Sequence, residues 1–211
     1  MRALGIGVRM ETKFSSAERK RIREGIKEKY KRVANSPDGN FNYPTGRAGL
    51  EGQKYDPHVL RELPEDVLAS YCGVGNPFSL GSVNKGETVL DIGCGTGVDT
   101  LVAAIMVGHE GRVTGIDLIP EMLEQARTNL EKTSLKNVTF QEGSAEQLPF
   151  PDETFDVAIS NGVFNLIPDK TKALREVSRV LKSSGRFLLA DQILMGDMPH
   201  DTESMVKNWA R

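Results

Sequence analysis

The segment Thr88-Val89-Leu90-Asp91-Ile92-Gly93-Cys94-Gly95-Thr96-Gly97 indicates the fold class of the chain. Its first half is a short apolar run with β-branched residues, which is typical of a buried strand. The glycines that follow allow the positive φ angles of a tight turn. The next segment, Asp99–Val107, is predicted to be a buried helix that ends at Gly108. A strand, a glycine turn and a helix in this order predict the first unit of a parallel α/β sheet.

The same alternation continues toward the C-terminus. Further strands are predicted at Arg112–Asp117, Asn137–Glu142, Phe155–Ser160 and Arg186–Ala190, and helices at Pro120–Lys132 and Lys170–Leu181. Strands that alternate with helices at this spacing form crossover units, whose strands run parallel. We therefore expect an α/β, doubly wound, Rossmann-like sheet of five strands.

The glycine turn lies where such sheets bind ligands, beyond the carboxyl ends of the strands and near the point where strand order reverses. Its backbone N–H groups stand at a helix N-terminus and favour an anionic group. A tight turn without a ligand is the alternative. Asp117 ends the second predicted strand, 20 residues after Gly97, where a carboxylate can accept hydrogen bonds from ribose hydroxyls. The two features together predict a nucleoside cofactor.

The spacing of the glycines separates two kinds of cofactor. A dinucleotide fingerprint that starts at Gly93 requires glycine at position 98, which is Val98 here. Pyrophosphate binding is therefore disfavoured. An NAD-dependent oxidoreductase is kept only as the third hypothesis for the function. The motif Asp91–Gly97 resembles the first motif of class I S-adenosylmethionine-dependent methyltransferases. This resemblance implies an enzyme with a Rossmann-like methyltransferase sheet and S-adenosyl-L-methionine as its cofactor.

The resemblance also implies a set of cofactor-binding residues. The glycine turn would cradle the methionyl part, with Asp91 near the amino group and Asp117 on the ribose. Leu118 and Met122 would flank the adenine, although simple core packing is an equal alternative for both. The full set is Asp91, Gly93, Gly95, Gly97, Asp117, Leu118, Met122, Ser144, Ala145, Glu146 and Asn161, of which Asn161 would face the reacting end of the cofactor.

A closer resemblance is to arsenite methyltransferases. It rests on Leu63-Pro64-Glu65, Cys72–Pro77, Gly86–Asp91 and Ser160–Lys170. It implies a small-molecule acceptor, and trivalent arsenic prefers thiolate ligands. Cys72 precedes the first strand of the sheet and is the candidate catalytic residue on the acceptor side, with an inert packed thiol as the alternative.

The sequence departs from that family at Gly162, where the family carries a cysteine. The acceptor therefore stays open among arsenite, another thiophilic species and an organic metabolite. Cys94 belongs to the glycine turn and is expected to be a small buried residue. His58, His109 and His200 share no metal-ligand spacing with the cysteines, so no metal site is expected. A catalytically silent cofactor-binding subunit is the alternative function.

Seven-stranded enzymes of this class continue past the fifth strand, whereas here only a short polar helix, Thr202–Ala210, is predicted after it. A sheet truncated after its fifth strand would expose an edge, which predicts a homodimer through that edge. A second hypothesis is that the stop after Arg211 is a misread selenocysteine codon. The chain would then be the truncated product of a longer (seleno)methyltransferase, and the codon itself tests this.

The first third of the chain lacks the regular alternation of strands and helices. Ser15–Val33 is predicted to be a thin amphipathic helix capped by Ser15 or Ser16. Asn35–Pro57 is predicted to be an irregular segment that could cover a pocket. A short helix is predicted at Pro64–Tyr71, with the proline in its first turn. We therefore expect residues 1–80 to form a helical and irregular N-terminal extension, a possible cover of the active site, and residues 81–211 to form the cofactor-binding domain.

Composition sets the remaining limits. The 211 residues include 27 Lys and Arg against 29 Asp and Glu, for a net charge of −2. This balance gives no electrostatic case for nucleic acid or anionic lipid as a partner. No apolar stretch is long enough to cross a membrane, and no signal peptide is evident. Only two cysteines are present, so reduced thiols and a cytoplasmic location are expected.

Overall fold

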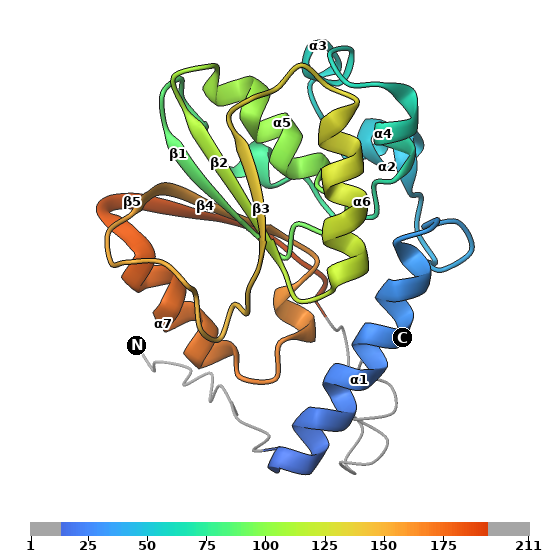
Figure 1. The fold of residues 1–211 in the computed structure, drawn as a ribbon, viewed down its shortest axis with the longest axis vertical. Coiled ribbons are helices and arrows are strands. Elements are labelled where there is room, and N and C mark those ends of the chain that lie inside the picture. Colours follow the sequence, from blue (N-terminus) through green and yellow to red (C-terminus); the bar gives the residue numbers. More distant parts are fainter. Residues whose placement is uncertain (1–13, 194–211) are drawn as a thin grey trace, which may run out of the picture.

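The computed structural model describes residues 14–193 and contains a five-stranded parallel sheet in the order β3-β2-β1-β4-β5 (Figure 1). The strands are β1 Thr88–Ile92, β2 Arg112–Asp117, β3 Val138–Glu142, β4 Phe155–Asn161 and β5 Leu181–Ala190. The order reverses at β1, which pairs with β2 on one side and β4 on the other. The predicted α/β, doubly wound fold is confirmed.

Helices cover both faces of the sheet. Helices α5 (Val98–Val107) and α6 (Pro120–Glu131) lie on one face and α7 (Lys170–Val180) on the other (Figure 1). Successive side chains of a strand point to opposite faces, so Val89 packs in the core on the α5 side and Leu90 in the core on the α7 side. This alternation explains why the strands are apolar almost throughout.

The N-terminal segments are largely helical. Helix α1 (Ser16–Val33) is capped by Ser15, one of the two predicted caps, in a capping box in which the Ser15 hydroxyl accepts the Glu18 N–H and the Glu18 carboxylate accepts the Ser15 N–H. It is followed by α2 (Gly46–Gly52), α3 (Pro57–Leu60), α4 (Glu65–Ala69) and the 3₁₀ helix η1 (Pro77–Leu80), and a second 3₁₀ helix, η2 (Phe164–Leu166), follows β4. Leu50 and Leu68 share one buried core with Leu101 of α5.

Three local expectations differ from the structure. Helix α2 lies inside the segment predicted to be irregular. Its Gly49 serves close packing, because a Cβ on that residue would lie 2.5 Å from the Pro44 carbonyl oxygen. Pro64 is the N-cap of α4 and not a residue of its first turn. Strand β5 begins at Leu181, five residues before the predicted start, with an irregularity in its pairing to β4.

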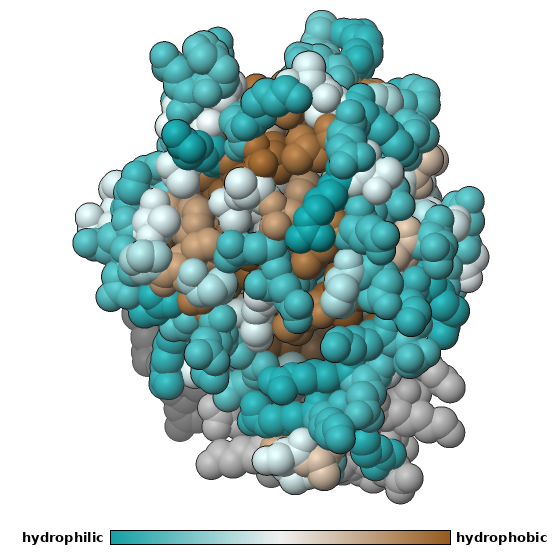
Figure 2. All heavy atoms as spheres, viewed as in Figure 1, coloured by the Kyte–Doolittle hydropathy of each residue, from teal (hydrophilic) through white to brown (hydrophobic). Residues whose placement is uncertain are grey.

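The surface agrees with the composition. In Figure 2, hydrophilic side chains cover most of the visible face, and apolar side chains show between them near its centre. Within residues 14–193 no helix is both long and apolar enough to cross a membrane. The predicted helix Thr202–Ala210 and His200 lie outside the described residues, and the division of the chain at residue 80 stays a prediction.

Candidate functional site

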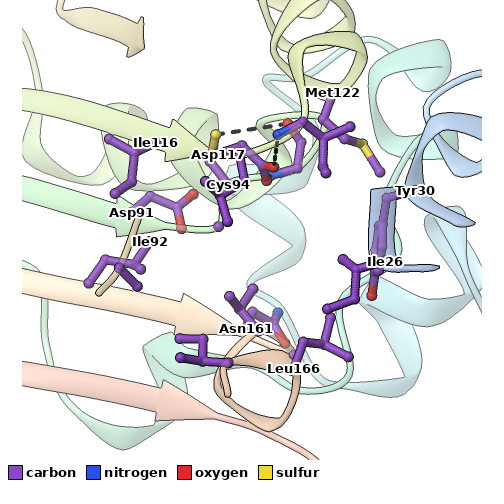
Figure 3. Close-up of a pocket in the computed structure, with 18 of the residues that line it drawn as sticks. Ile26, Tyr30, Asp91, Ile92, Cys94, Ile116, Asp117, Met122, Asn161 and Leu166 are labelled. Carbon is purple, nitrogen blue, oxygen red and sulfur yellow. Dashed lines mark hydrogen bonds between the residues drawn. The ribbon is translucent and has the colours of Figure 1, made fainter. Parts of the chain in front are cut away.

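A pocket opens beyond the carboxyl ends of β1, β2 and β4, where the sequence predicted a ligand. Its floor is the glycine turn after β1, and its far wall is α1. Figure 3 shows Ile26 and Tyr30 of α1 on the side of the pocket opposite Cys94 and Asp117. All the predicted site residues except Gly97 line it, namely Cys72, Asp91, Gly93, Gly95, Asp117, Leu118, Met122, Ser144, Ala145, Glu146 and Asn161.

The three predicted glycines of the turn have positive φ angles but differ in what surrounds them. A Cβ on Gly93 would lie 2.4 Å from Val163, and one on Gly97 would lie 2.8 Å from Phe140. These two glycines therefore serve close packing of the turn against the protein. Gly95 has a φ of +53° and no protein atom within 4 Å of a Cβ position. Its exposed backbone leaves room for a ligand to lie directly on the turn.

Asp117 holds the turn in place from the end of β2. One of its carboxylate oxygens accepts the Gly95 N–H at 2.9 Å, and the other accepts the Ile119 N–H at 2.9 Å. A carboxylate has about four acceptor positions, so Asp117 retains capacity for the hydroxyls of a ligand. Burial raises the pKa of Asp117, and the backbone N–H donors, led by Ile119, oppose that rise.

A buried polar cluster lies beside the turn and joins Asp99, Tyr55, Tyr71 and Asn161. The Asp99 carboxylate accepts the Tyr55 hydroxyl at 2.6 Å and the Asn161 amide at 2.9 Å. The Asn161 side chain also accepts the Gly75 N–H at 3.0 Å and donates to the Tyr71 hydroxyl at 3.1 Å. Asn161 therefore ties the loop after Cys72 to the end of β4.

Two carboxylates of this region, those of Asp91 and Asp99, form no ion pair with the described residues. Asp91 accepts the Thr100 hydroxyl at 2.6 Å. Burial raises the pKa of Asp91, and the neighbouring Asp99 carboxylate raises it further. Burial also raises the pKa of Asp99 to about 6, against the opposing hydrogen bonds from Tyr55 and Asn161. The pair therefore favours a single negative charge near neutral pH.

The opposite end of the pocket is closed by ion pairs to α1. Arg23 reaches Glu146 at 2.6 Å, and Arg19 lies 3.7 Å from Glu146 and 3.6 Å from Asp169. Glu146 keeps 9 % of its side chain exposed, so these pairs fix it at the rim.

Both predicted adenine-flanking residues line this end of the pocket. Met122 is buried with Val33 of α1, whereas Leu118 is 42 % exposed. Met122 can therefore contact a ligand or pack in the core, whereas core packing alone does not explain the position of Leu118.

The two cysteines are free thiols on different parts of the pocket wall. Cys94 is buried in the glycine turn. Cys72 is half-buried, and burial raises its pKa to about 12, with the charges of Asp117 and Asp99 adding to the rise. The Cys72 side chain is thus a neutral thiol in the ligand-free pocket. Among residues 14–193, no three His, Cys, Asp or Glu side chains are grouped so that they could hold a metal ion.

The charge balance of the pocket indicates what it can hold. Four carboxylates from the described residues line it, on Asp91, Asp99, Asp117 and Glu146. Within residues 14–193, the one cationic side chain that lines it is that of Arg23, which already pairs with Glu146. A buried site with surplus negative charge favours a cationic ligand. A sulfonium nucleoside fits both this charge and the bare backbone at Gly95.

Sequence reasoning missed Asp99, Tyr55 and Tyr71. Asp99 follows Gly97 by two residues, and its place in the first turn of a helix at the ligand edge was a usable signal. The tyrosines gave no such signal, because their positions depend on the packing of distant segments.

A family model described as a methyltransferase domain matches residues 83–211. The chain belongs to the methyltransferase domain family. The match and the relatives below identify it as a class I S-adenosylmethionine-dependent methyltransferase domain, close to arsenite methyltransferases. S-adenosylmethionine is the cofactor of this class, as the sequence predicted.

Three proteins illustrate the similarity. An arsenite methyltransferase of Halobacterium salinarum is 33% identical over 207 residues, which cover 92% of this chain and 53% of that protein. A demethylmenaquinone methyltransferase of Listeria welshimeri is 43% identical over 110 residues, 52% of this chain and 46% of that protein. The crystal structure of an arsenic(III) S-adenosylmethionine methyltransferase from Chlamydomonas reinhardtii matches with a TM-score of 0.53 and 35% identity, over 71% of this chain and 50% of that one. The chain spans about half the length of the curated relatives it matches.

Proposed function

We propose that this methyltransferase domain binds S-adenosylmethionine in the pocket beyond β1 and transfers its methyl group to a small thiophilic acceptor, with arsenite as the first candidate. The observation that carries the proposal is the pocket itself. It combines bare backbone at Gly95 with surplus negative charge from Asp117 and from the Asp91 and Asp99 pair. A cation with an anionic amino-acid end and a ribose matches each part of that surface.

In this proposal, different residues bind different parts of the cofactor. The glycine turn holds the amino-acid part, with Asp91 near its amino group. The free acceptor positions of Asp117 take the ribose hydroxyls. Leu118 and Met122 flank the adenine, and Ser144–Glu146 lie at its edge. Asn161 faces the end that carries the methyl group.

S-adenosylmethionine, when bound, supplies a methyl group on a positively charged sulfur that a nucleophile attacks in line. The protein contributes position and exclusion of water more than acid or base groups. Ile26 and Tyr30 of α1 and Leu166 form an apolar wall opposite the glycine turn (Figure 3). A soft acceptor is easily desolvated against such a wall.

The acceptor is proposed from the thiol that the pocket exposes. Cys72 lines the same cavity as Asn161, and a thiol is the ligand that trivalent arsenic prefers. The arsenite methyltransferases among the relatives support this choice. An organic acceptor such as a demethylmenaquinol is the second candidate, because Gly162 supplies no thiol to the pocket and a demethylmenaquinone methyltransferase is 43% identical to this chain over 110 residues.

The experiment has two stages. Thermal melts with S-adenosylhomocysteine and with NAD test the cofactor, and we expect only the former to raise the melting temperature. Transfer of a labelled methyl group to arsenite, with and without a thiol reductant, and to a demethylmenaquinol then tests the acceptor. Stabilisation by NAD alone would overturn the proposal. Binding without transfer to any acceptor would identify a silent cofactor-binding subunit instead.

We further propose that the N-terminal extension covers the active site. Helix α1 supplies Ile26 and Tyr30 to the pocket wall and is fixed to the rim through Arg23. Among the described residues, the apolar contacts near its N-terminal end include a small cluster of Phe14, Ile22 and Ile26. Ion pairs therefore contribute much of what keeps this end of α1 over the pocket.

We also propose that a second copy of the chain pairs with the sheet at β5. Among the described residues, β5 pairs with β4 alone, so its other edge presents unpaired backbone groups. Sedimentation at high protein concentration should detect a dimer, and a clean monomer would count against it.

A further inference from the structure

We propose that Asp99, held by Tyr55 and Asn161, sets the preference of the pocket for the cationic methyl donor over its neutral thioether product. This inference rests on the proposed function and assigns to Asp99 a role in discriminating substrate from product. The two ligands share their adenosine and amino-acid parts. They differ in one methyl group and one positive charge, so a group that tells them apart must respond to charge.

Asp99 lies beside Asn161, which faces the reacting end of the cofactor in the proposed binding mode. Asp99 is 8 % exposed and lines the pocket with Asn161. The Tyr55 hydroxyl and the Asn161 amide donate to its two oxygens at 2.6 and 2.9 Å. Both donors favour the ionised form of the carboxyl, and both hold it still. Among the described residues Asp99 forms no ion pair, so this rigid carboxylate favours a bound cation.

The hydrogen-bond donors favour the ionised form of Asp99 more than that of Asp91, whose donors, hydroxyl and backbone N–H, both come from Thr100. Asp91 receives one side-chain hydrogen bond, from Thr100, whereas Asp99 receives two. The other titratable groups that act on this region are Asp117 of β2, Tyr71 and Cys72. Tyr71 and Cys72 are neutral near pH 7, and the Asp117 oxygens bind the backbone of the turn. The positive charge of Lys29, on α1, lowers the pKa of Cys72, and the Lys29 Nζ lies 5.0 Å from the centre of the Phe41 ring.

The protonation state of Asp99 then links pH to ligand choice. Burial raises its pKa to about 6, so part of the population carries a proton on Asp99 in mildly acidic solution. A bound sulfonium favours the ionised form and expels that proton. A bound thioether has no such effect. Donor binding should therefore release protons below about pH 6.5, and product binding should not.

The test measures the dissociation constants of S-adenosylmethionine and S-adenosylhomocysteine by calorimetry from about pH 5 to about pH 8. We expect the wild-type ratio of product to donor dissociation constants to rise about tenfold across this range, because Asp99 becomes ionised. Asp99→Asn should lower donor affinity by about tenfold, leave product affinity nearly unchanged and flatten the pH dependence. Calorimetry in two buffers of different ionisation enthalpy counts the protons released.

Gly95→Ala is the matched control, because it crowds the pocket without changing a charge and should weaken both ligands by the same factor. An Asp99→Asn variant that also weakens both ligands equally would overturn the inference. A flat ratio in the wild-type pH series would do the same, and this series decides the matter even if the variant does not fold. If the wild type binds neither ligand, the proposed function falls as well.

Discussion

Gly95 is the position at which ligand binding and folding can be separated. Its φ is +53°, and a Cβ there would meet no protein atom within 4 Å. Gly86, ahead of β1 and so at the opposite edge of the sheet, has a φ of +82° and an equally open Cβ position. Gly95→Ala and Gly86→Ala therefore impose a similar backbone strain with no steric clash inside the protein.

The magnitudes follow from that comparison. A left-handed conformation costs an alanine roughly 1 to 2 kcal/mol. For a chain of this size, the loss corresponds to a fall of about 2 to 8 °C in melting temperature for each variant. Only the methyl group at position 95 enters the pocket. Crowding a well-packed contact costs about 1 to 3 kcal/mol, so S-adenosylhomocysteine should bind Gly95→Ala roughly 5-fold to 150-fold more weakly.

Two measurements check this. Thermal melts without ligand should show similar destabilisation for both variants, and calorimetry should show weaker binding for Gly95→Ala alone. The reasoning is refuted if Gly95→Ala binds S-adenosylhomocysteine as well as Gly86→Ala does. Equal weakening in both variants would also contradict it, because strain and not crowding would then explain the loss.

Three further predictions concern the pocket rim, the thiol and the buried acids. Arg23→Ala removes the 2.6 Å ion pair to Glu146 and should lower the free energy of unfolding by under about 1 kcal/mol. It should also speed the dissociation of S-adenosylhomocysteine in stopped-flow measurements, and unchanged dissociation would contradict the cover role of α1. Cys72→Ser should abolish transfer to a thiophilic acceptor while cofactor affinity stays within about twofold of wild type, and full turnover would remove Cys72 from the acceptor site. Burial raises the pKa of Asp99 from 3.8 to about 6, so the folded state binds this proton more tightly than the unfolded chain. The free energy of unfolding of the ligand-free protein should then rise as pH falls from about 7 toward 5, within a limit of about 3 kcal/mol over the full window; thermal melts that stay flat or fall across this window would count against it.

Local patterns predicted the sheet and the glycine turn well. Strands β1 and β2 match their predicted bounds, because short β-branched runs between turn residues leave few alternatives. Helix α2 escaped prediction because its glycines are typical of loops, whereas the close approach of Pro44 explains the glycine at position 49. Such an approach depends on tertiary packing, which a local window of sequence does not contain.

Most predicted site residues lie next to the strands, whereas the missed Tyr55 and Tyr71 come from distant segments of the chain. Asp117 was predictable because it ends a strand at the ligand edge. Arg23 reaches Glu146 across 123 positions, and Asn161 reaches Tyr55 across 106. No spacing rule links residues so far apart, so these contacts could be found only from the folded chain.

The surplus charge of the pocket is likewise a property of the fold and not of the composition. The whole chain is nearly balanced, at −2, yet Asp91, Asp99 and Asp117 converge on one cavity because β1, the start of α5 and the end of β2 meet at the point where strand order reverses. Burial then makes each carboxylate costly to ionise without a cation. The positive charge of a bound sulfonium ligand offsets that cost. The cost returns when the methyl group is transferred, because the sulfur then becomes neutral. The same arrangement that selects the donor therefore favours release of the product, and the glycine turn need only hold the parts that both ligands share.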